Sequence, residues 1–184
     1  MGCFKRLNLN PWGRNAADCT VRALAAAVGM KYRAVCRVLG ADCVEGRGAD
    51  CGADFVTPGL IAEKFRPFFG EIKTAWDGLT VRLFRSSPRL WPDFGITIGE
   101  FCREYAGRGR FVLLALPPKE ERGPLSFFDS FHAVYADLCP GKGYFIDSWD
   151  SSRLVVAAYM RVTGILRTDD PRSMFYRPGK TEAP

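Results

Sequence analysis

Histidine is almost absent from this chain of 184 residues, in which His132 is the only one. A zinc site that needs two histidines is therefore excluded, and none of the seven cysteines belongs to a CxxC pair. Cys36, Cys43 and Cys51 lie closest together in the sequence, but their loose spacing is not typical of structural zinc. We therefore expect no metal ion and no bound cofactor.

Long apolar runs are missing as well. No segment approaches the length of about 20 apolar residues that a membrane-spanning helix needs. The start of the chain, MGCFKRLNLNPWG, lacks the apolar centre of a secretory signal peptide. An odd number of cysteines in a chain of this length also disfavours a disulfide framework. We therefore expect an intracellular protein with reduced thiols, no signal peptide and no membrane span.

The charge balance is basic, with a formal net charge of +6. The Lys and Arg residues are spread along the chain, with one denser stretch at 81–90 (VRLFRSSPRL). No helix-turn-helix, zinc-finger or RNA-binding signature accompanies them. A nucleic-acid-binding module would therefore rest on charge alone, and we expect nucleic acid not to be the partner.

Helical patterns dominate the first half of the chain and strand patterns the second. Glycines or capping residues bound the predicted helices at 16–28, 31–39, 57–65 and 97–107. Alternation and β-branched residues predict strands at 79–84, 110–116, 131–138, 143–149 and 160–166, and residues 41–56 look like a long loop. This segregation favours the α+β class, in one domain over residues 1–176 with a flexible tail at 177–184.

A cysteine stands where the first predicted helix begins, in NAADCTVRALAAAVG. The N–H groups and the dipole at a helix N-terminus favour the thiolate form of Cys19. His132 lies near the start of one predicted strand and Asp147 at the end of the next, so an antiparallel hairpin would bring them together on one face. Asp18 would raise the pKa of the thiol if it pointed inward; we expect it to cap the helix or to pair at the surface.

Each of these residues has a simpler interpretation when it is taken alone. A lone cysteine near a helix start is more often structural, and a lone histidine on a strand is more often part of the core or the surface. Asp147 and Ser148 fit a turn that closes a strand, and Trp149 fits the core. Their joint occurrence instead favours a triad in which Cys19 is the nucleophile, His132 the base and Asp147 its orienting carboxylate.

The order of these residues resembles the papain-like cysteine peptidases, over residues 15–149. DSW at 147–149 is similar to the Asn-Ser-Trp sequence of that family, with Asp147 in place of Asn, as in the bacteriocin-processing peptidase domains of ABC exporters. The Asp-Cys start followed by Arg-Ala-Leu and GMKY is most similar to small peptidases encoded by bacteria and their phages.

The resemblance implies a papain-like fold, in which an N-terminal helical half carries the nucleophile helix and packs on a C-terminal antiparallel sheet. It also implies that Trp149 shields the His132–Asp147 pair. The oxyanion-hole glutamine that the family places six residues before the cysteine is missing. Asn15, four residues before Cys19, is our substitute, donating to the oxyanion together with the Cys19 N–H.

The expected function is hydrolysis of an amide or isopeptide bond in a protein or peptide substrate, through a thioester acyl-enzyme and without a cofactor. The resemblance adds a bacterial or phage origin and a place inside the cell or in the virion. One alternative keeps the fold without the chemistry, as a structural or virion-associated interaction protein. A second is acyl transfer to an amine, since transglutaminases and acyltransferases also use Cys, His and Asp.

Overall fold

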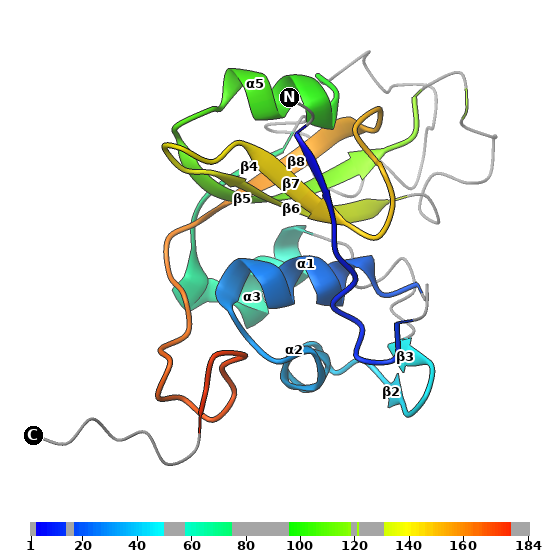
Figure 1. Ribbon diagram of the computed structural model, residues 1–184, viewed down its shortest axis with the longest axis vertical. Coiled ribbons are helices and arrows are strands. Elements are labelled where there is room, and N and C mark those ends of the chain that lie inside the picture. Colours follow the sequence, from blue (N-terminus) through cyan, green and yellow to red (C-terminus); the bar gives the residue numbers. More distant parts are fainter. Residues whose placement is uncertain are drawn as a thin grey trace, which may run out of the picture.

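A mixed β-sheet forms the centre of the protein (Figure 1). The computed structural model describes residues 3–13, 17–49, 58–74, 96–118, 121 and 131–177. Within these residues the six-stranded sheet has the order β1-β7-β6-β5-β8-β4. Its strands are β1 (Phe4–Arg6), β4 (Phe69–Thr74), β5 (Gly109–Leu116), β6 (His132–Leu138), β7 (Tyr144–Asp147) and β8 (Val155–Val162). Neighbouring strands are antiparallel except β1 and β7, which are parallel.

Helices cover both faces of this sheet, and Figure 1 shows α5 on one side and α1, α2 and α3 on the other. Their bounds are α1 (Cys19–Val28), α2 (Tyr32–Leu39), α3 (Pro58–Lys64) and α5 (Ile98–Glu104). Helix α1 packs on β6 and β5, and α2 packs on α1. A 3-10 turn, η2 (Arg66–Phe68), follows α3, and a small hairpin of β2 (Cys43–Val44) and β3 (Gly48–Ala49) follows α2. In the part of the chain that the structure describes, no helix is long and apolar enough to cross a membrane.

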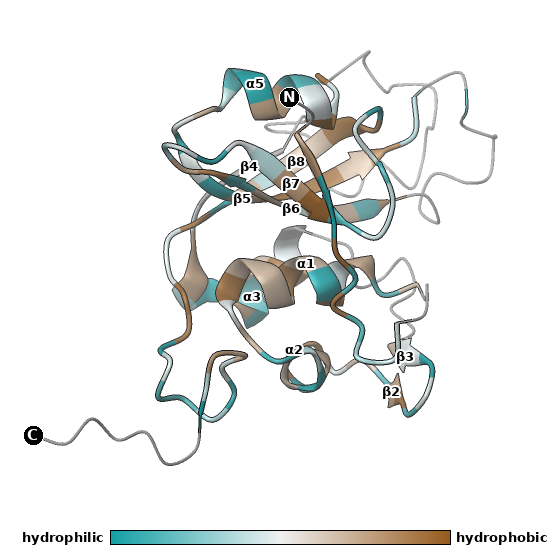
Figure 2. Ribbon diagram, viewed as in Figure 1, coloured by the Kyte–Doolittle hydropathy of each residue, from teal (hydrophilic) through white to brown (hydrophobic). Residues whose placement is uncertain are grey.

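The core lies in two layers, one on each face of the sheet. Val112 and Leu114 of β5 join the layer under α1, while Phe111 and Leu113 join the layer under α5. A strand buried on both faces has no polar side to present to water, which explains the continuous apolar sequence of β5. Figure 2 shows the resulting apolar colouring of the strands between the helical layers.

Several predicted elements are confirmed. Helices α1 and α2 end at Gly29 and Gly40, both in the left-handed conformation. Helix α5 begins with the predicted capping box, in which Thr97 and Glu100 bond each other's backbone N–H groups. The fold as a whole combines helices with a mixed sheet and is compatible with the α+β class.

The prediction of a C-terminal antiparallel sheet holds only for part of the observed sheet. Strands β1 and β4 come from the first half of the chain, and β1 adds the one parallel pairing of the described sheet. β1 has three residues, Phe4–Arg6, and lies at the edge with two of them exposed, so it carries no alternating pattern. The predicted loop at 41–56 contains the β2–β3 hairpin over its described part. The strand predicted at 79–84 lies outside the described residues.

The last strand begins earlier than predicted. β8 spans Val155–Val162, whereas the pattern predicted a strand at 160–166. Thr163 and Gly164 leave the sheet because their N–H groups bond the carbonyl of Phe68 instead of a strand. The next residues run back toward α1, where the N–H of Leu166 bonds the carbonyl of Val28.

Candidate active site

Cys19 is the first residue of α1, and the helix places it beside the start of β6. The residue as a whole is partly exposed, while its thiol group is largely buried. The side chain of His132 and the backbone N–H of Ala133 lie close enough to the thiol to lower its pKa. The structure therefore brings together two residues that the sequence places more than a hundred positions apart.

His132 and Asp147 are joined by a hydrogen bond of 2.5 Å between Nε2 and Oδ2. The antiparallel register of β6 and β7 ends at the pair Tyr135–Ile146, so the bond between His132 and Asp147 lies just beyond the last paired residues of the two strands. Since Nε2 is engaged by Asp147, Nδ1 is the ring nitrogen left to face Cys19.

The carboxylate of Asp147 is buried and held by further donors. The Ser151 hydroxyl donates to Oδ2 at 2.6 Å, and the Ser148 backbone N–H donates to Oδ1 at 2.7 Å. Burial alone would raise the pKa of this carboxyl, but the His132, Ser151 and Ser148 hydrogen bonds lower it below its ordinary value. Asp147 is therefore ionised at neutral pH and offers a fixed negative charge to the imidazole.

The thiol and the imidazole shift each other's pKa in opposite directions. Burial alone would raise the pKa of the Cys19 thiol, but the hydrogen bond and charge of His132, the Ala133 N–H and the charge of Arg22 together lower it. Burial alone would lower the pKa of His132, but its bonds to Asp147 and Cys19 raise it to about 9. These directions favour a thiolate–imidazolium pair at neutral pH.

Trp149 packs against the His132 ring, with 5.2 Å between ring centroids and 45° between the planes. Nearly half of its surface remains exposed, which is unusual for so large an apolar side chain. The indole thus covers one side of the imidazole while its other side faces outward.

Asp18 stands at the N-cap position of α1, but its side chain neither makes a capping bond nor pairs at the surface, so the prediction for this side chain is wrong. Its side chain is fully buried and makes no capping bond with α1. Oδ1 accepts from Arg22 Nε at 2.8 Å, while Oδ2 accepts from Tyr32 Oη at 2.7 Å and Asn10 Nδ2 at 3.0 Å. A buried carboxylate needs such donors, and three side chains supply them.

Asn15, the predicted oxyanion donor, lies outside the described residues, as does Cys51. The described asparagine nearest in sequence to the site, Asn10, is buried and engaged elsewhere. Its amide donates to Asp18 and, at 3.3 Å, to the carbonyl of Arg47. The backbone N–H of Cys19 stands in the first turn of α1, where N–H groups have no partner within the helix.

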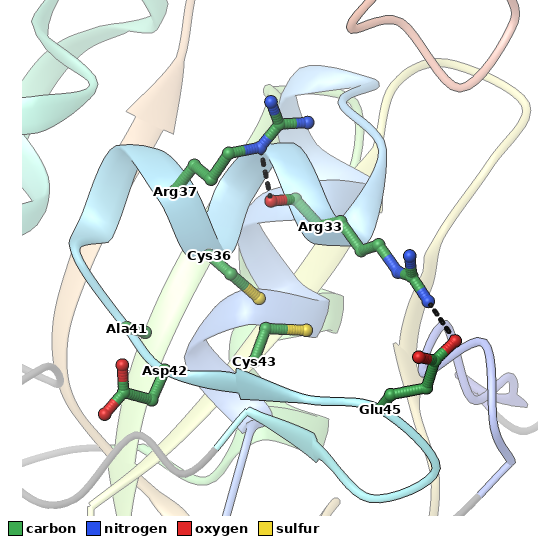
Figure 3. A pocket seen from close by; sticks show the side chains of 7 residues that line it. All are labelled: Arg33, Cys36, Arg37, Ala41, Asp42, Cys43 and Glu45. Carbon is green, nitrogen blue, oxygen red and sulfur yellow. Dashed lines mark hydrogen bonds and ion pairs between the residues drawn. The ribbon is translucent and has the colours of Figure 1, made fainter.

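Of two hollows in the protein, a small one is lined by residues of the Cys19 site and a larger one is not. A cavity of about 10 Å³ lies between Cys19, Arg22 and Asp147, and the side chains of Leu7 and Leu9 close it. A larger and more open hollow of about 490 Å³ lies between α2 and the β2–β3 hairpin. Figure 3 shows that Cys36 and Cys43 line it together with charged side chains, none of which belongs to the Cys19 site. The described residues contain no cluster of three or more His, Cys, Asp or Glu arranged to hold a metal ion.

Sequence reasoning missed Arg22, Tyr32, Asn10 and Ser151. One signal was available for Arg22: it follows Asp18 by four residues, the spacing at which opposite charges meet on a helix. Asn10 and Tyr32 are placed by the tertiary structure, because no local spacing marks a side chain that reaches a buried carboxylate from another element. Ser151 follows Asp147 by four residues in an irregular segment, where that spacing has no fixed geometry.

Comparisons of the chain with protein-family models, with curated proteins and with solved structures give no match. The chemistry of the site is therefore inferred from its geometry. That geometry consists of a thiol at a helix start, an imidazole beside it that lowers its pKa, and a buried carboxylate bonded to the imidazole. Such a set of groups is suited to nucleophilic catalysis on a carbonyl carbon.

Proposed function

We propose that this chain is a papain-like cysteine peptidase or isopeptidase, with Cys19 as nucleophile, His132 as acid–base and Asp147 as the orienting carboxylate. The observation that carries the proposal is the hydrogen bond between His132 and Asp147, together with the placement of His132 beside the Cys19 thiol, whose pKa it lowers. A helix with the nucleophile packed on a sheet with the base also agrees with the family resemblance of the sequence. The bacterial or phage origin, and a place in the cell or the virion, rest on that resemblance.

The reaction begins when the Cys19 thiolate attacks the carbonyl carbon of the substrate amide. The backbone N–H of Cys19 donates to the oxyanion that forms, because it stands at the positive end of α1. The His132 imidazolium then gives its proton to the leaving amine, which breaks the C–N bond and leaves a thioester on Cys19. Neutral His132 next takes a proton from water, the resulting hydroxide equivalent attacks the thioester, and the acid product leaves.

Asp147 keeps the imidazole in the orientation that these transfers need. With Nε2 bonded to Asp147, Nδ1 remains directed at the thiol, and the carboxylate stabilises the imidazolium while it exists. Trp149 reduces contact between this hydrogen-bonded pair and water by packing over the ring.

The proposal is tested by exposing the protein to a peptide library made from a proteome digest and sequencing the new termini. The parent is expected to cut a subset of peptides and to carry a transient acyl group on Cys19, seen as a hydroxylamine-sensitive mass increase. Cys19→Ala is expected to abolish both. Cys139→Ala is the matched control, because Cys139 is also partly exposed but lies away from His132.

Two other results would give different functions. An acyl-enzyme that forms but passes its acyl group to added amines, with little hydrolysis, would identify an acyltransferase. Neither cleavage nor an acyl-enzyme in the parent would contradict the peptidase proposal and leave the fold as an interaction module.

A further inference from the structure

Arg22 lies between two buried carboxylates of the candidate site. Its Nε donates to Asp18 Oδ1 at 2.8 Å, and its Nη1 lies 3.5 Å from Asp147 Oδ1. The three side chains are almost entirely buried, with exposures of 9% for Arg22, 0% for Asp18 and 2% for Asp147. A buried arginine that faces two carboxylates is held much more rigidly than a surface ion pair.

The two oxygens of Asp147 have separate partners. Oδ2 faces His132 and Ser151, whereas Oδ1 faces the Ser148 N–H and Arg22. Rotation of the carboxylate would break the contact with His132 and the contact with Arg22 together. The guanidinium therefore opposes rotation from the side of the carboxylate that His132 does not touch.

Asp18 anchors the guanidinium in this position. Asp18 is itself fixed by Tyr32 and Asn10, and the hydroxyl of Tyr32 accepts the backbone N–H of Ala49. These bonds tie the segment before α1, helix α2 and the β2–β3 hairpin to one carboxylate. Lysine in place of Arg22 would supply the charge, but a single ammonium group lacks the fork that reaches Asp18 and Asp147 at once.

Direct binding of substrate by Arg22 is disfavoured by the space around it. The cavity that it shares with Cys19 and Asp147 has a volume of about 10 Å³. A water molecule needs roughly 10–15 Å³ measured in this way, so a substrate side chain does not fit. Arg22 thus acts on the reaction through the groups that it contacts.

We propose that Arg22 is a positioning residue: anchored by Asp18, its guanidinium holds Asp147 in the orientation that binds His132 and places a positive charge beside the Cys19 thiolate. The catalytic part of this proposal rests on the proposed function. Its structural part, the support of the Asp147–His132 bond, is measurable whether or not the protein is a peptidase.

The test uses the full chain labelled with ¹⁵N, in which His132 gives the only imidazole signals. The Nε2–H proton of His132 is expected far downfield and protected from exchange, because a short bond to a carboxylate holds it. The variants are Arg22→Lys and the double variant Asp18→Asn/Arg22→Met, which removes both charges of the buried pair and so avoids leaving one unpaired. Arg37→Met is the control, since Arg37 is exposed on α2.

Both variants are expected to move the Nε2–H signal upfield and to speed its exchange with water by about tenfold or more, while Arg37→Met leaves it unchanged. In Arg22→Met alone, which removes the positive charge and keeps Asp18, alkylation of Cys19 at about pH 6 is expected to be slower than in the parent, because the pKa of the thiol rises. Retention of the parent Nε2–H signal and exchange rate in the double variant would overturn the proposal and leave Arg22 as a partner of Asp18 only. If the double variant does not fold, the Nε2–H signal and its exchange in Arg22→Lys decide, since lysine keeps the charge but lacks the fork that reaches both carboxylates.

Failure of the proposed function gives a different pattern. Slow alkylation of Cys19 in the parent would remove the catalytic role. The His132 Nε2–H signal would still respond to the Arg22 variants if Arg22 supports Asp147.

Discussion

The charge state of one histidine decides the chemistry of the candidate site. His132 is expected to titrate at about 9 in the folded protein, against an ordinary value of 6.5, so it is protonated at neutral pH. Burial opposes this, and the bonds to Asp147 and Cys19 outweigh burial. An NMR titration of the single imidazole measures the value directly. A titration near 6.5 would contradict the ion pair.

The same titration separates the two partners of His132. Asp147→Asn removes a negative charge and Cys19→Ser removes the thiolate, so both substitutions are expected to lower the pKa of His132. Ser151→Ala removes a donor to Asp147 without changing a charge, and it serves as the comparison. An equal effect of all three would mean that packing, and not charge, sets the pKa.

Among the buried side-chain nitrogens and oxygens of the described residues, the hydroxyl of Thr20 is the one without a hydrogen-bond partner. Thr20→Val keeps the shape and removes the unpaired hydroxyl, so it is expected to raise the free energy of unfolding by about 1 kcal/mol. Thr20→Ser keeps the hydroxyl and loses a methyl group, which is expected to lower it by about 1 kcal/mol. Urea unfolding of the three proteins checks both signs; destabilisation by Val would mean that the hydroxyl has a partner in solution.

Among the elements, the helices were more predictable than the strands. Gly29, Gly40 and the Thr97–Glu100 capping box mark helix ends by local chemistry, which the sequence displays directly. β1 forms because it pairs with the edge of β7. The three residues of β1 are mostly polar and carry no pattern that predicts a strand. The predicted bounds of β8 are wrong for a similar reason. The strand ends where the N–H groups of Thr163 and Gly164 bond the carbonyl of Phe68, a contact that local sequence does not show.

The β2–β3 hairpin contributes to the site through one close approach. Gly48 has a φ of +105°, and a methyl group there would collide with the amide of Asn10, which donates to Asp18. Gly48→Ala is therefore expected to lower the free energy of unfolding by about 1–3 kcal/mol. It is also expected to disturb the donors of Asp18.

A matched glycine in the same hairpin separates backbone strain from this collision. Gly46 has a φ of +78° but open space where a methyl group would stand. Gly46→Ala is expected to cost about 1–2 kcal/mol from the left-handed backbone alone. Thermal unfolding compares the two variants, and equal losses would mean that the approach of Asn10 to Gly48 is unimportant.

At the scale of the whole molecule, the candidate site joins the start of one helix to the end of a distant hairpin. The sequence predicted Cys19, His132 and Asp147 because nucleophile, base and carboxylate are recognisable by residue type and order. It predicted the Asp18 environment wrongly, since burial of that carboxylate depends on Tyr32 and Asn10 from separate segments. A prediction from local pattern reaches these three side chains but not the buried hydrogen-bond network around Asp18.

The most direct test of the central claim is the rate of Cys19 alkylation against pH, followed by peptide mass mapping, in the parent and in His132→Ala. We predict that Cys19 reacts rapidly well below the ordinary thiol pKa of about 8.5, and that His132→Ala loses this reactivity. Cys43 and Cys139 are partly exposed as well and serve as controls within the same protein. Labelling of Cys19 no faster than these two, and unchanged in His132→Ala, would contradict a thiolate–imidazolium pair and with it the peptidase proposal.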